Sequence, residues 1–388
     1  MLPPRATRTV TVSRLTIGGD APIAVQSMAA TPTANLEQTL EQVAILKSAG
    51  ADLIRLAVDS RADLAALHHI RDATDATLCV DLQESYRLAA DLAPLVDKLR
   101  YNPGHLHHHD PARPVPDKVA WLAEQAANHN CALRIGVNAG SFPPEYASRF
   151  ADDHVAASVQ CAMDHCELVE RSGFTNFVVS LKDSDPRLVI KANERFAALR
   201  PDVPLHLGVT EAGLPPDGVI KTRIAFEQLM AQGIGDTLRV SLTVPFEQKG
   251  LEIEVGRQII ADIAAGRFRS VPKGFFDGLN IIACPSCSRV ENNSFVSLAE
   301  EIKRTTTYAA DENITIAVMG CRVNGPGETD SADLGLWCGP RLVTLKRGPR
   351  TIGAWPFDEV LPQLHTQLRE ILAQRTCPSA EQSGESVS

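Results

Sequence analysis

Eight short apolar runs, each separated from the next by a stretch with helical spacing, constrain the fold of this chain more than any other feature. The runs are Ile23–Gln26, Leu53–Val58, Thr77–Asp81, Lys98–Tyr101, Ala132–Val137, Asn176–Leu181, Pro204–Val209 and Thr237–Leu242. After the first run, leucine and valine recur every three or four residues from Leu36 to Leu46, and Gly50 follows as a helix stop. Strands that alternate with helices predict a parallel sheet, and eight such units predict a closed (β/α)8 barrel. A doubly wound open sheet is the alternative.

Polar side chains lie within or directly after each run, at the end where barrels build their active sites. In chain order these are Gln26 and Ser27, Arg55, Asp81, Arg100 and Asn102, Arg134 and Asn138, Ser180 and Lys182, His206, Thr210 and Glu211, and Arg239 and Ser241. Arginines in apolar strands need a partner, because burying an isolated charge is prohibitive. Structural ion pairs with Asp81 and Glu211 are one explanation. We prefer a basic cup for a phosphorylated ligand, since guanidinium groups match phosphate oxygens in bidentate geometry.

Beyond residue 280 the pattern restarts as a small α/β unit. The stretches Leu279–Ala283, Ile314–Met319 and Arg341–Leu345 are typical of strands, and Ser297–Lys303 and Phe357–Leu372 are typical of helices. We therefore expect a barrel over residues 1–265 and an α/β domain over residues 266–375. Residues 376–388, in which Ser, Gly and Glu accumulate, are expected to form a disordered tail.

Two cysteine motifs follow strands of this second unit. The first, Cys284-Pro-Ser-Cys287, places two thiolates three positions apart, where they can hold one metal centre. In the second, Cys321-Arg-Val-Asn-Gly-Pro-Gly-Glu328, the glycines and proline predict a sharp turn that brings Glu328 back toward Cys321. Three soft sulfurs and one hard oxygen suit an iron–sulfur cluster better than structural zinc, which prefers four Cys or His ligands.

A CxxC motif by itself also occurs in zinc ribbons and redox pairs. A zinc ribbon completed by Cys338, or a barrel enzyme with a CxxC redox pair, is therefore an alternative. The upstream thiols are interpreted as small buried hydrophobes, as free cysteines commonly are; these are Cys79, Cys131, Cys161 and Cys166.

Charge and hydropathy exclude several partners. The formal net charge is −9, from 38 Lys and Arg against 47 Asp and Glu, which argues against a nucleic-acid partner. We expect no membrane contact and a cytoplasmic location, because no apolar run reaches the roughly 18 residues of a membrane helix and the N-terminus lacks a signal-peptide core. The histidines at 105, 107, 108 and 109 are expected in a solvated loop, because neighbouring loop histidines rarely supply metal geometry.

These motifs together resemble the GcpE family, the 4-hydroxy-3-methylbut-2-enyl diphosphate synthases of the non-mevalonate isoprenoid pathway. Besides the two cysteine motifs, the likeness rests on Gly18–Met28, Asp97–Gly104, Arg134–Ser141, His206–Gly213 and Gly235–Leu242. It extends from about residue 10 to about residue 370.

The resemblance implies a [4Fe-4S] cluster in the small α/β domain, held by Cys284, Cys287, Cys321 and Glu328. It implies reductive dehydration and ring opening of 2-C-methyl-D-erythritol 2,4-cyclodiphosphate to (E)-4-hydroxy-3-methylbut-2-enyl diphosphate. Reduced ferredoxin or flavodoxin would supply the electrons. The resemblance also favours a head-to-tail homodimer in which each cluster domain covers the barrel of the other chain.

By the same resemblance, the basic residues of the barrel become candidates for holding the diphosphate. The substrate-binding candidates are Arg55, Arg100, Arg134, Asn138, Lys182, His206, Lys221, Arg239 and Arg289. The candidates for proton transfer are Glu247 and Glu252. Glu328 is also assigned a catalytic role, since a carboxylate is a poorer ligand for cluster iron than a thiolate and can yield its position to substrate.

Three places depart from the family's usual pattern. Val80-Asp-Leu-Gln83 stands where Ala-Asp-Ile-His is expected, so the usual histidine is missing there. Thr243-Val-Pro245 stands where an acid usually precedes the proline, which is why Glu247 and Glu252 become the acidic candidates. The link from Ala261 to Asn280 is longer than the commonest form, without loss of a motif.

Overall fold

The computed structural model describes residues 5–82, 85–108, 110–151, 153–268, 278–321 and 323–376. These form two compact units. One contains the described residues up to 268 together with Pro285–Val290, and the other contains residues 278–284 and 291–376. The expected disordered tail, Cys377 and Gln83 lie outside the described residues. Within them, no helix combines the length and apolar character that a membrane crossing requires.

The first unit is a barrel of eight parallel strands. They are β3 (Ala24–Met28), β4 (Leu53–Ala57), β5 (Leu78–Asp81), β6 (Lys98–Tyr101), β7 (Ala132–Asn138), β8 (Phe177–Lys182), β9 (His206–Leu207) and β10 (Thr237–Leu238). Neighbouring strands pair in chain order from β3 to β8, and β10 pairs with both β9 and β3. A parallel bridge between Val179 and Leu205 joins β8 to the residue before β9 and closes the ring. The closed (β/α)8 barrel is thus confirmed.

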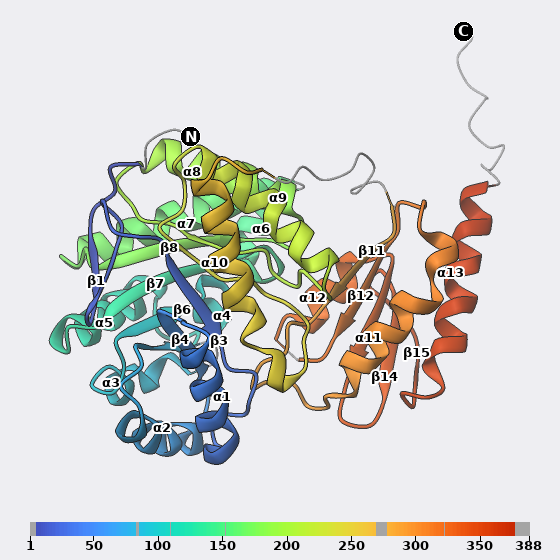
Figure 1. Ribbon diagram of the computed structural model, residues 1–388, viewed down its shortest axis with the longest axis horizontal. Coiled ribbons are helices and arrows are strands. Elements are labelled where there is room, and N and C mark those ends of the chain that lie inside the picture. The colour runs from blue at the N-terminus through green and yellow to red at the C-terminus, as the bar shows by residue number, and fades with distance from the viewer. Residues whose placement is uncertain are drawn as a thin grey trace, which may run out of the picture. The chain divides into compact units, whose positions relative to one another are not determined.

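Helices surround these strands, as Figure 1 shows. They are α1 (Leu36–Ser48), α2 (Arg61–Ala73), α3 (Ala89–Leu92), α4 (Pro103–His108), α5 (Val115–Asn128), α6 (Pro144–Phe150), α7 (His154–Arg171), α8 (Pro186–Leu199), α9 (Asp217–Ala231) and α10 (Leu251–Ala264). Their apolar faces pack on the outward side chains of the strands; Val43 of α1 and Ile54 of β4, for example, belong to one buried cluster. Local sequence sets the helix starts, as where Ser60 and Asp63 form a capping box before α2.

An N-terminal hairpin, which the sequence pattern did not predict, supplies the barrel with an apolar floor. Strands β1 (Val10–Val12) and β2 (Leu15–Ile17) pair antiparallel. Their buried side chains cluster with apolar residues near the amino ends of the barrel strands, namely Ala24, Leu53, Cys79, Ala132 and Val178. Polar chemistry inside the barrel is therefore placed above this floor, toward the carboxyl ends of the strands.

Within the described residues, the second unit contains a five-stranded sheet, three α-helices and the short 3-10 helix η4 (Thr307–Ala309). The order of the sheet is β11 (Asn280–Ala283), β12 (Thr315–Met319), β13 (Leu334–Cys338), β14 (Val343–Arg347) and β15 (Arg350–Trp355). The first three strands are parallel, and β14 and β15 continue antiparallel. The α-helices are α11 (Ser294–Thr305), α12 (Gly325–Ser331) and α13 (Val360–Thr376).

Two local expectations were wrong. The Asn324–Gly327 stretch does not turn sharply: Asn324 is the N-cap of α12 and Pro326 lies in its first turn, where a proline's missing N–H is no loss. The histidine run does not form a loop either, because residues 103–108 form the short helix α4, with His105 and His107 half-buried. His109 lies outside the described residues.

Candidate active site

Strand alternation determines which residues enter the barrel. Side chains two positions apart point to the same side of a strand. The series that begins in the apolar floor with Leu53, Cys79 and Ala132 therefore continues upward with Arg55, Asp81 and Arg134. All three of these side chains are buried. A polar layer thus lies directly above the apolar floor.

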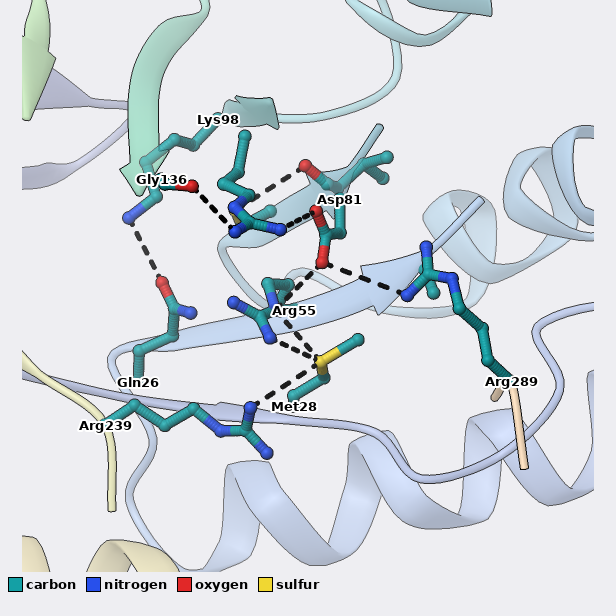
Figure 2. A network of polar contacts seen from close by, with 12 residues as sticks. Gln26, Met28, Arg55, Asp81, Lys98, Gly136, Arg239 and Arg289 are labelled. Atoms are coloured by element: carbon teal, nitrogen blue, oxygen red, sulfur yellow. Dashed lines mark hydrogen bonds and ion pairs between the residues drawn. The ribbon is translucent and has the colours of Figure 1, made fainter. Parts of the chain in front are cut away.

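Asp81 is the hub of this layer (Figure 2). Its carboxylate lies 2.8 Å from Nη1 of Arg100, 3.9 Å from Nε of Arg55 and 3.9 Å from Nη1 of Arg289. Burial alone raises the pKa of Asp81, but the three guanidinium groups outweigh it and hold the pKa well below its usual value. Three predicted substrate-binding residues therefore meet at one permanent carboxylate.

Among the described residues, the buried arginines and lysines of the barrel exceed the carboxylates that pair with them. Arg134 is 1% exposed, and in the described part of the chain none of its guanidinium nitrogens has a hydrogen-bond partner. Burial lowers its pKa, and Arg55 and Arg100 lower it further. Buried polar groups normally have partners, so three orphaned donors on one buried arginine indicate a place for an anionic ligand.

Two lysines and a histidine belong to the same electrostatic environment. Burial lowers the pKa of Lys182 well below its usual value, and Arg134, Arg55, Arg239 and Arg100 add to the effect. Burial likewise lowers the pKa of His206 and lowers that of Lys98 to about 8. Nζ of Lys98 donates to Oε1 of Gln26 at 3.2 Å. Burial and the surrounding cations thus weaken proton binding at all three groups, and a bound negative charge would oppose that effect.

Met28 occupies the position of an acceptor between two of the arginines (Figure 2). Nε and Nη2 of Arg55 lie 3.0 and 2.7 Å from its sulfur, and Nη1 of Arg239 lies 3.8 Å away. A thioether is a weak acceptor. Phosphate oxygens are far stronger acceptors for guanidinium donors, so these two arginines remain available for a phosphorylated ligand.

Two glycines make room for the cations. A Cβ on Gly136 would lie 2.1 Å from Nε of Arg100, and a Cβ on Gly208 would lie 2.6 Å from Nζ of Lys182. Nη2 of Arg100 also donates to the Gly136 carbonyl at 2.9 Å. Strands β7 and β8 pair Asn138 with Lys182 at their carboxyl ends. Lys221 is buried in α9.

The acidic candidates differ in their surroundings. Glu247 is exposed on the short 3-10 turn η3 (Phe246–Gln248). Glu252 is fully buried and accepts hydrogen bonds from Ser27 Oγ at 2.6 Å, Leu242 N at 2.9 Å and Lys249 Nζ at 2.9 Å. Although burial raises the pKa of Glu252, Lys249, Arg239 and Ser27 lower it below its usual value. Glu252 is thus held as a carboxylate.

Two further acidic residues stand near the carboxyl ends of β8 and β9. Glu211 is buried with a φ of 48°, a left-handed backbone that is costly for a residue other than glycine. Burial raises the pKa of Asp183 to about 6, and Glu211 contributes to the rise. The sequence pattern gave Glu211 only a structural role as an ion-pair partner. The acid that follows an apolar strand end was the signal available for both residues.

The second unit places two cysteines at neighbouring strand ends. Cys284 follows β11 and its backbone N–H donates to Val318 of β12 at 3.0 Å, while Cys321 comes two residues after β12. Both thiols and the Glu328 carboxylate are largely buried. Within the described residues, no three His, Cys, Asp or Glu side chains are grouped closely enough to hold a metal ion. The soft donors at adjacent strand ends nevertheless fit the chemistry of an iron–sulfur centre.

Cys287 lies in the Pro285–Val290 segment of the barrel unit and is half-buried. Cys338, the fourth ligand that a zinc ribbon would use, ends β13 in an apolar environment. Burial raises the pKa of its thiol to about 12.

A parallel barrel lined with buried cations, together with an α/β unit that carries cysteines at its strand ends, defines a (β/α)8-barrel enzyme for an anionic substrate. The GcpE TIM-barrel domain family matches residues 7–257, and the GcpE protein C-terminal domain family matches residues 280–370. The chain belongs to the GcpE family.

Curated relatives agree with this assignment along nearly the whole chain. A protein of Rhodopirellula baltica is 58% identical over 95% of this chain and 96% of its own length. Relatives from Nitratiruptor and Tropheryma whipplei (strain Twist) are 40% and 38% identical, over 95% and 93% of this chain and 98% and 90% of their own lengths. All three carry the name 4-hydroxy-3-methylbut-2-en-1-yl diphosphate synthase (flavodoxin), so the reaction of these enzymes is a redox reaction.

One similar solved structure is more distant in sequence than these relatives. The spore coat polysaccharide biosynthesis protein spsE of Bacillus subtilis superposes with a TM-score of 0.48 and 11% identity, over 69% of this chain and 76% of that chain. Nothing further rests on that likeness.

Proposed function

We propose that this protein reduces 2-C-methyl-D-erythritol 2,4-cyclodiphosphate, opening its ring and removing water to give (E)-4-hydroxy-3-methylbut-2-enyl diphosphate. Family membership supports the reaction, and the observation that carries the assignment to this chain is the buried guanidinium of Arg134. Its orphaned donors lie among cations that exceed their counter-charges. A diphosphate supplies both the missing acceptors and the missing negative charge.

In this proposal the barrel cations bind and orient the diphosphate. Arg134 and Arg239 present guanidinium donors, and Arg55 exchanges the Met28 sulfur for a phosphate oxygen. Arg100 stays on Asp81, whose carboxylate fixes its direction. A bound anion favours the Lys182 ammonium and so opposes burial and the neighbouring arginines, which lower the pKa of Lys182. Asn138, His206, Lys221 and Arg289 complete the proposed substrate contacts.

The redox cofactor is proposed to be a [4Fe-4S] cluster held by Cys284, Cys287, Cys321 and Glu328. Cys284 and Cys321 follow adjacent parallel strands, and rigid elements suit ligands that must keep their positions. When bound, the cluster supplies single electrons and Lewis acidity. Electrons are proposed to come from a reduced flavodoxin, as the names of the relatives indicate for those enzymes, or from a ferredoxin.

Of the acidic candidates, Glu252 is best suited to serve as a fixed anion. Its two oxygens already accept three hydrogen bonds, and its lowered pKa makes it a poor proton donor at neutral pH. Proton delivery therefore remains assigned to Glu247, and Glu328 keeps its proposed role beside the cluster.

We also propose a division of labour between residues 1–265 and 266–375, with the diphosphate in the first part and the cluster in the second. The active form is proposed to be a homodimer. The Pro285–Val290 segment contacts Asp59, Asp81 and Lys249 of its own chain. Subunit mixing can test whether a partner's cluster domain also takes part in turnover.

Anaerobic iron and sulfide analysis tests the cofactor and its ligands. Replacing Cys284, Cys287 or Cys321 by Ser should cost the cluster, because iron needs the thiolate. Glu328→Gln should retain part of the iron and lose turnover. Zinc in place of iron in the parent protein, or full iron in all three Cys variants, would refute the assignment.

A further inference from the structure

The Pro285–Val290 segment is attached to the barrel at two points. Arg289 forms an ion pair with Asp59: Nη2 donates to Oδ1 at 3.0 Å and Nε lies 2.7 Å from Oδ2, while Nη1 lies 3.9 Å from Asp81. At the other end of the segment, Nζ of Lys249 donates to the Pro285 carbonyl at 2.8 Å. Cys287 lies between these two attachments.

Lys249 is an unusual residue for this position. It stands between η3 and α10, and its side chain is fully buried. A buried ammonium must be compensated, and the compensation here is Glu252 at 2.9 Å. Glu252 is itself fixed by Ser27 and by the Leu242 backbone. The bond to Pro285 thus starts from a rigid ion pair rather than from a mobile surface lysine.

The backbone that Lys249 holds is strained. Ser286, directly after Pro285, has a φ of 60°, in the left-handed region that disfavours side chains. Such a conformation is energetically costly and persists only where its surroundings enforce it. Lys249 supplies the restraint on one side of Ser286, and the hydrogen bond from Val290 N to Cys287 O at 3.1 Å closes the turn on the other.

The same ammonium places positive charge close to Cys287. Burial lowers the pKa of Lys249, while Glu252 and, more weakly, Cys287 act to raise it, so the thiol lies within electrostatic range. Cys287 also acts to raise the pKa of Arg289. Two buried cations therefore interact electrostatically with one proposed cluster ligand. Positive charge near a redox centre favours its reduced form.

We propose that Lys249 is a positioning residue for Cys287: anchored by Glu252, it holds the Pro285 carbonyl and the strained Ser286 backbone, and it contributes positive charge beside the cysteine. The electrostatic part of this inference rests on the proposed function, because it requires a redox centre at Cys287. The restraint on the segment exists without any cofactor.

Two substitutions separate the restraint from the charge. Lys249→Met removes both, whereas Lys249→Gln removes the charge and keeps an N–H donor. Lys118→Met is the matched control. Lys118, in α5, is also buried, and it donates to a backbone carbonyl, that of Leu106, at 2.9 Å. All three are compared with the parent as full-length protein.

Hydrogen–deuterium exchange of the apo-protein measures how strongly Lys249 restrains the backbone of the segment. We expect exchange in the peptide spanning residues 285–290 to be at least severalfold faster in Lys249→Met, and unchanged in Lys118→Met. Iron and sulfide content after anaerobic reconstitution should fall severalfold in Lys249→Met. The midpoint potential of the reconstituted Lys249→Gln protein should be more negative than that of the parent, because one positive charge is lost.

Unchanged exchange, iron content and potential in both Lys249 variants would overturn the proposal. If Lys249→Met does not fold, Lys249→Gln decides: an unchanged potential overturns the electrostatic role. If the parent binds no iron, the proposed function fails, while the exchange measurement on the apo-protein still tests the restraint.

Discussion

At the scale of single residues, the barrel interior is an unusual concentration of buried cations. Arg55, Arg100, Arg134 and Arg239 are each at most 8% exposed, and they influence one another electrostatically. A folded protein tolerates such repulsion only when something compensates it, and Asp81 and Glu252 do so in part. The remaining charge is the driving force for binding an anion.

Replacing Arg134 by Lys tests whether the guanidinium fork matters. The substitution keeps the positive charge and loses bidentate geometry. Loss of one charge-assisted hydrogen bond, about 1.5–3 kcal/mol, should weaken binding of the cyclic diphosphate roughly ten- to hundredfold. Calorimetric titration measures this affinity. Arg257→Lys is the control, because Arg257 lies on the surface with Asp52 and should bind like the parent. Equal affinities for both variants would make Arg134 a structural residue.

The pKa of about 8 at Lys98 predicts a pH dependence of binding. Burial and the neighbouring arginines favour the neutral amine in the empty barrel, whereas a bound diphosphate favours the ammonium. Below pH 8 the ammonium is already present. Above pH 8 a proton must be taken up on binding, so affinity should fall up to tenfold for each pH unit. Lys98→Met should bind more weakly and lack this slope; an identical slope in the variant would show that another group takes up the proton.

At the scale of elements, one glycine within a strand and one directly after a strand determine how the cations fit. Gly136 in β7 lies against the Arg100 guanidinium, and Gly208, which follows β9, lies against the Lys182 ammonium. Inward-facing positions on neighbouring strands are close, so a long side chain on one strand needs a small residue on the next.

Gly136→Ala should therefore displace Arg100 without unfolding the barrel. Its Cβ would lie 2.1 Å from Arg100 Nε, so the flexible guanidinium must move and leave Asp81. We expect at least tenfold weaker substrate binding with an unchanged far-UV circular dichroism spectrum. A crystal structure of the variant with Arg100 still 2.8 Å from Asp81 would contradict this explanation.

Element by element, sequence periodicity found the barrel because buried parallel strands give continuous apolar runs. It missed β1 and β2, since three-residue strands show too little alternation to stand out. It missed β13 and β15, whose runs contain glycines. It took Asn324–Gly327 for a turn, although the proline and glycines lie in the first turn of α12.

The candidate site was predictable where charged or sulfur-bearing residues lie within apolar strands, as Arg100 and Arg134 do, or closely follow them, as the cysteines do. The environment of Glu252 was not predictable, because its partners Ser27 and Leu242 are distant in the sequence or contribute backbone. Only the Lys249–Glu252 spacing of three residues gave a local signal. Tertiary contacts determine whether such a carboxylate moves protons or holds a cation.

At the scale of the whole molecule, the proposal requires the diphosphate-binding barrel and the cluster ligands to act on one small substrate. Subunit mixing tests how the proposed homodimer arranges them. A cluster-deficient Cys321→Ser chain is combined with a substrate-deficient Arg134→Ala chain. If each cluster domain serves the partner's barrel, heterodimers contain one intact site and activity returns to a sizeable fraction of the parent's. No recovery in a mixture shown to exchange subunits means that each chain supplies its own cluster.

The most direct test is anaerobic turnover. The reconstituted protein is incubated with 2-C-methyl-D-erythritol 2,4-cyclodiphosphate and chemically reduced flavodoxin, and products are identified by mass spectrometry. The parent should form (E)-4-hydroxy-3-methylbut-2-enyl diphosphate, while Cys321→Ser and Arg134→Ala should each lose nearly all product, the first without a cluster and the second with its cluster spectrum intact. A cluster-loaded parent that leaves the cyclic diphosphate unchanged, or undiminished product from Cys321→Ser, would contradict the account.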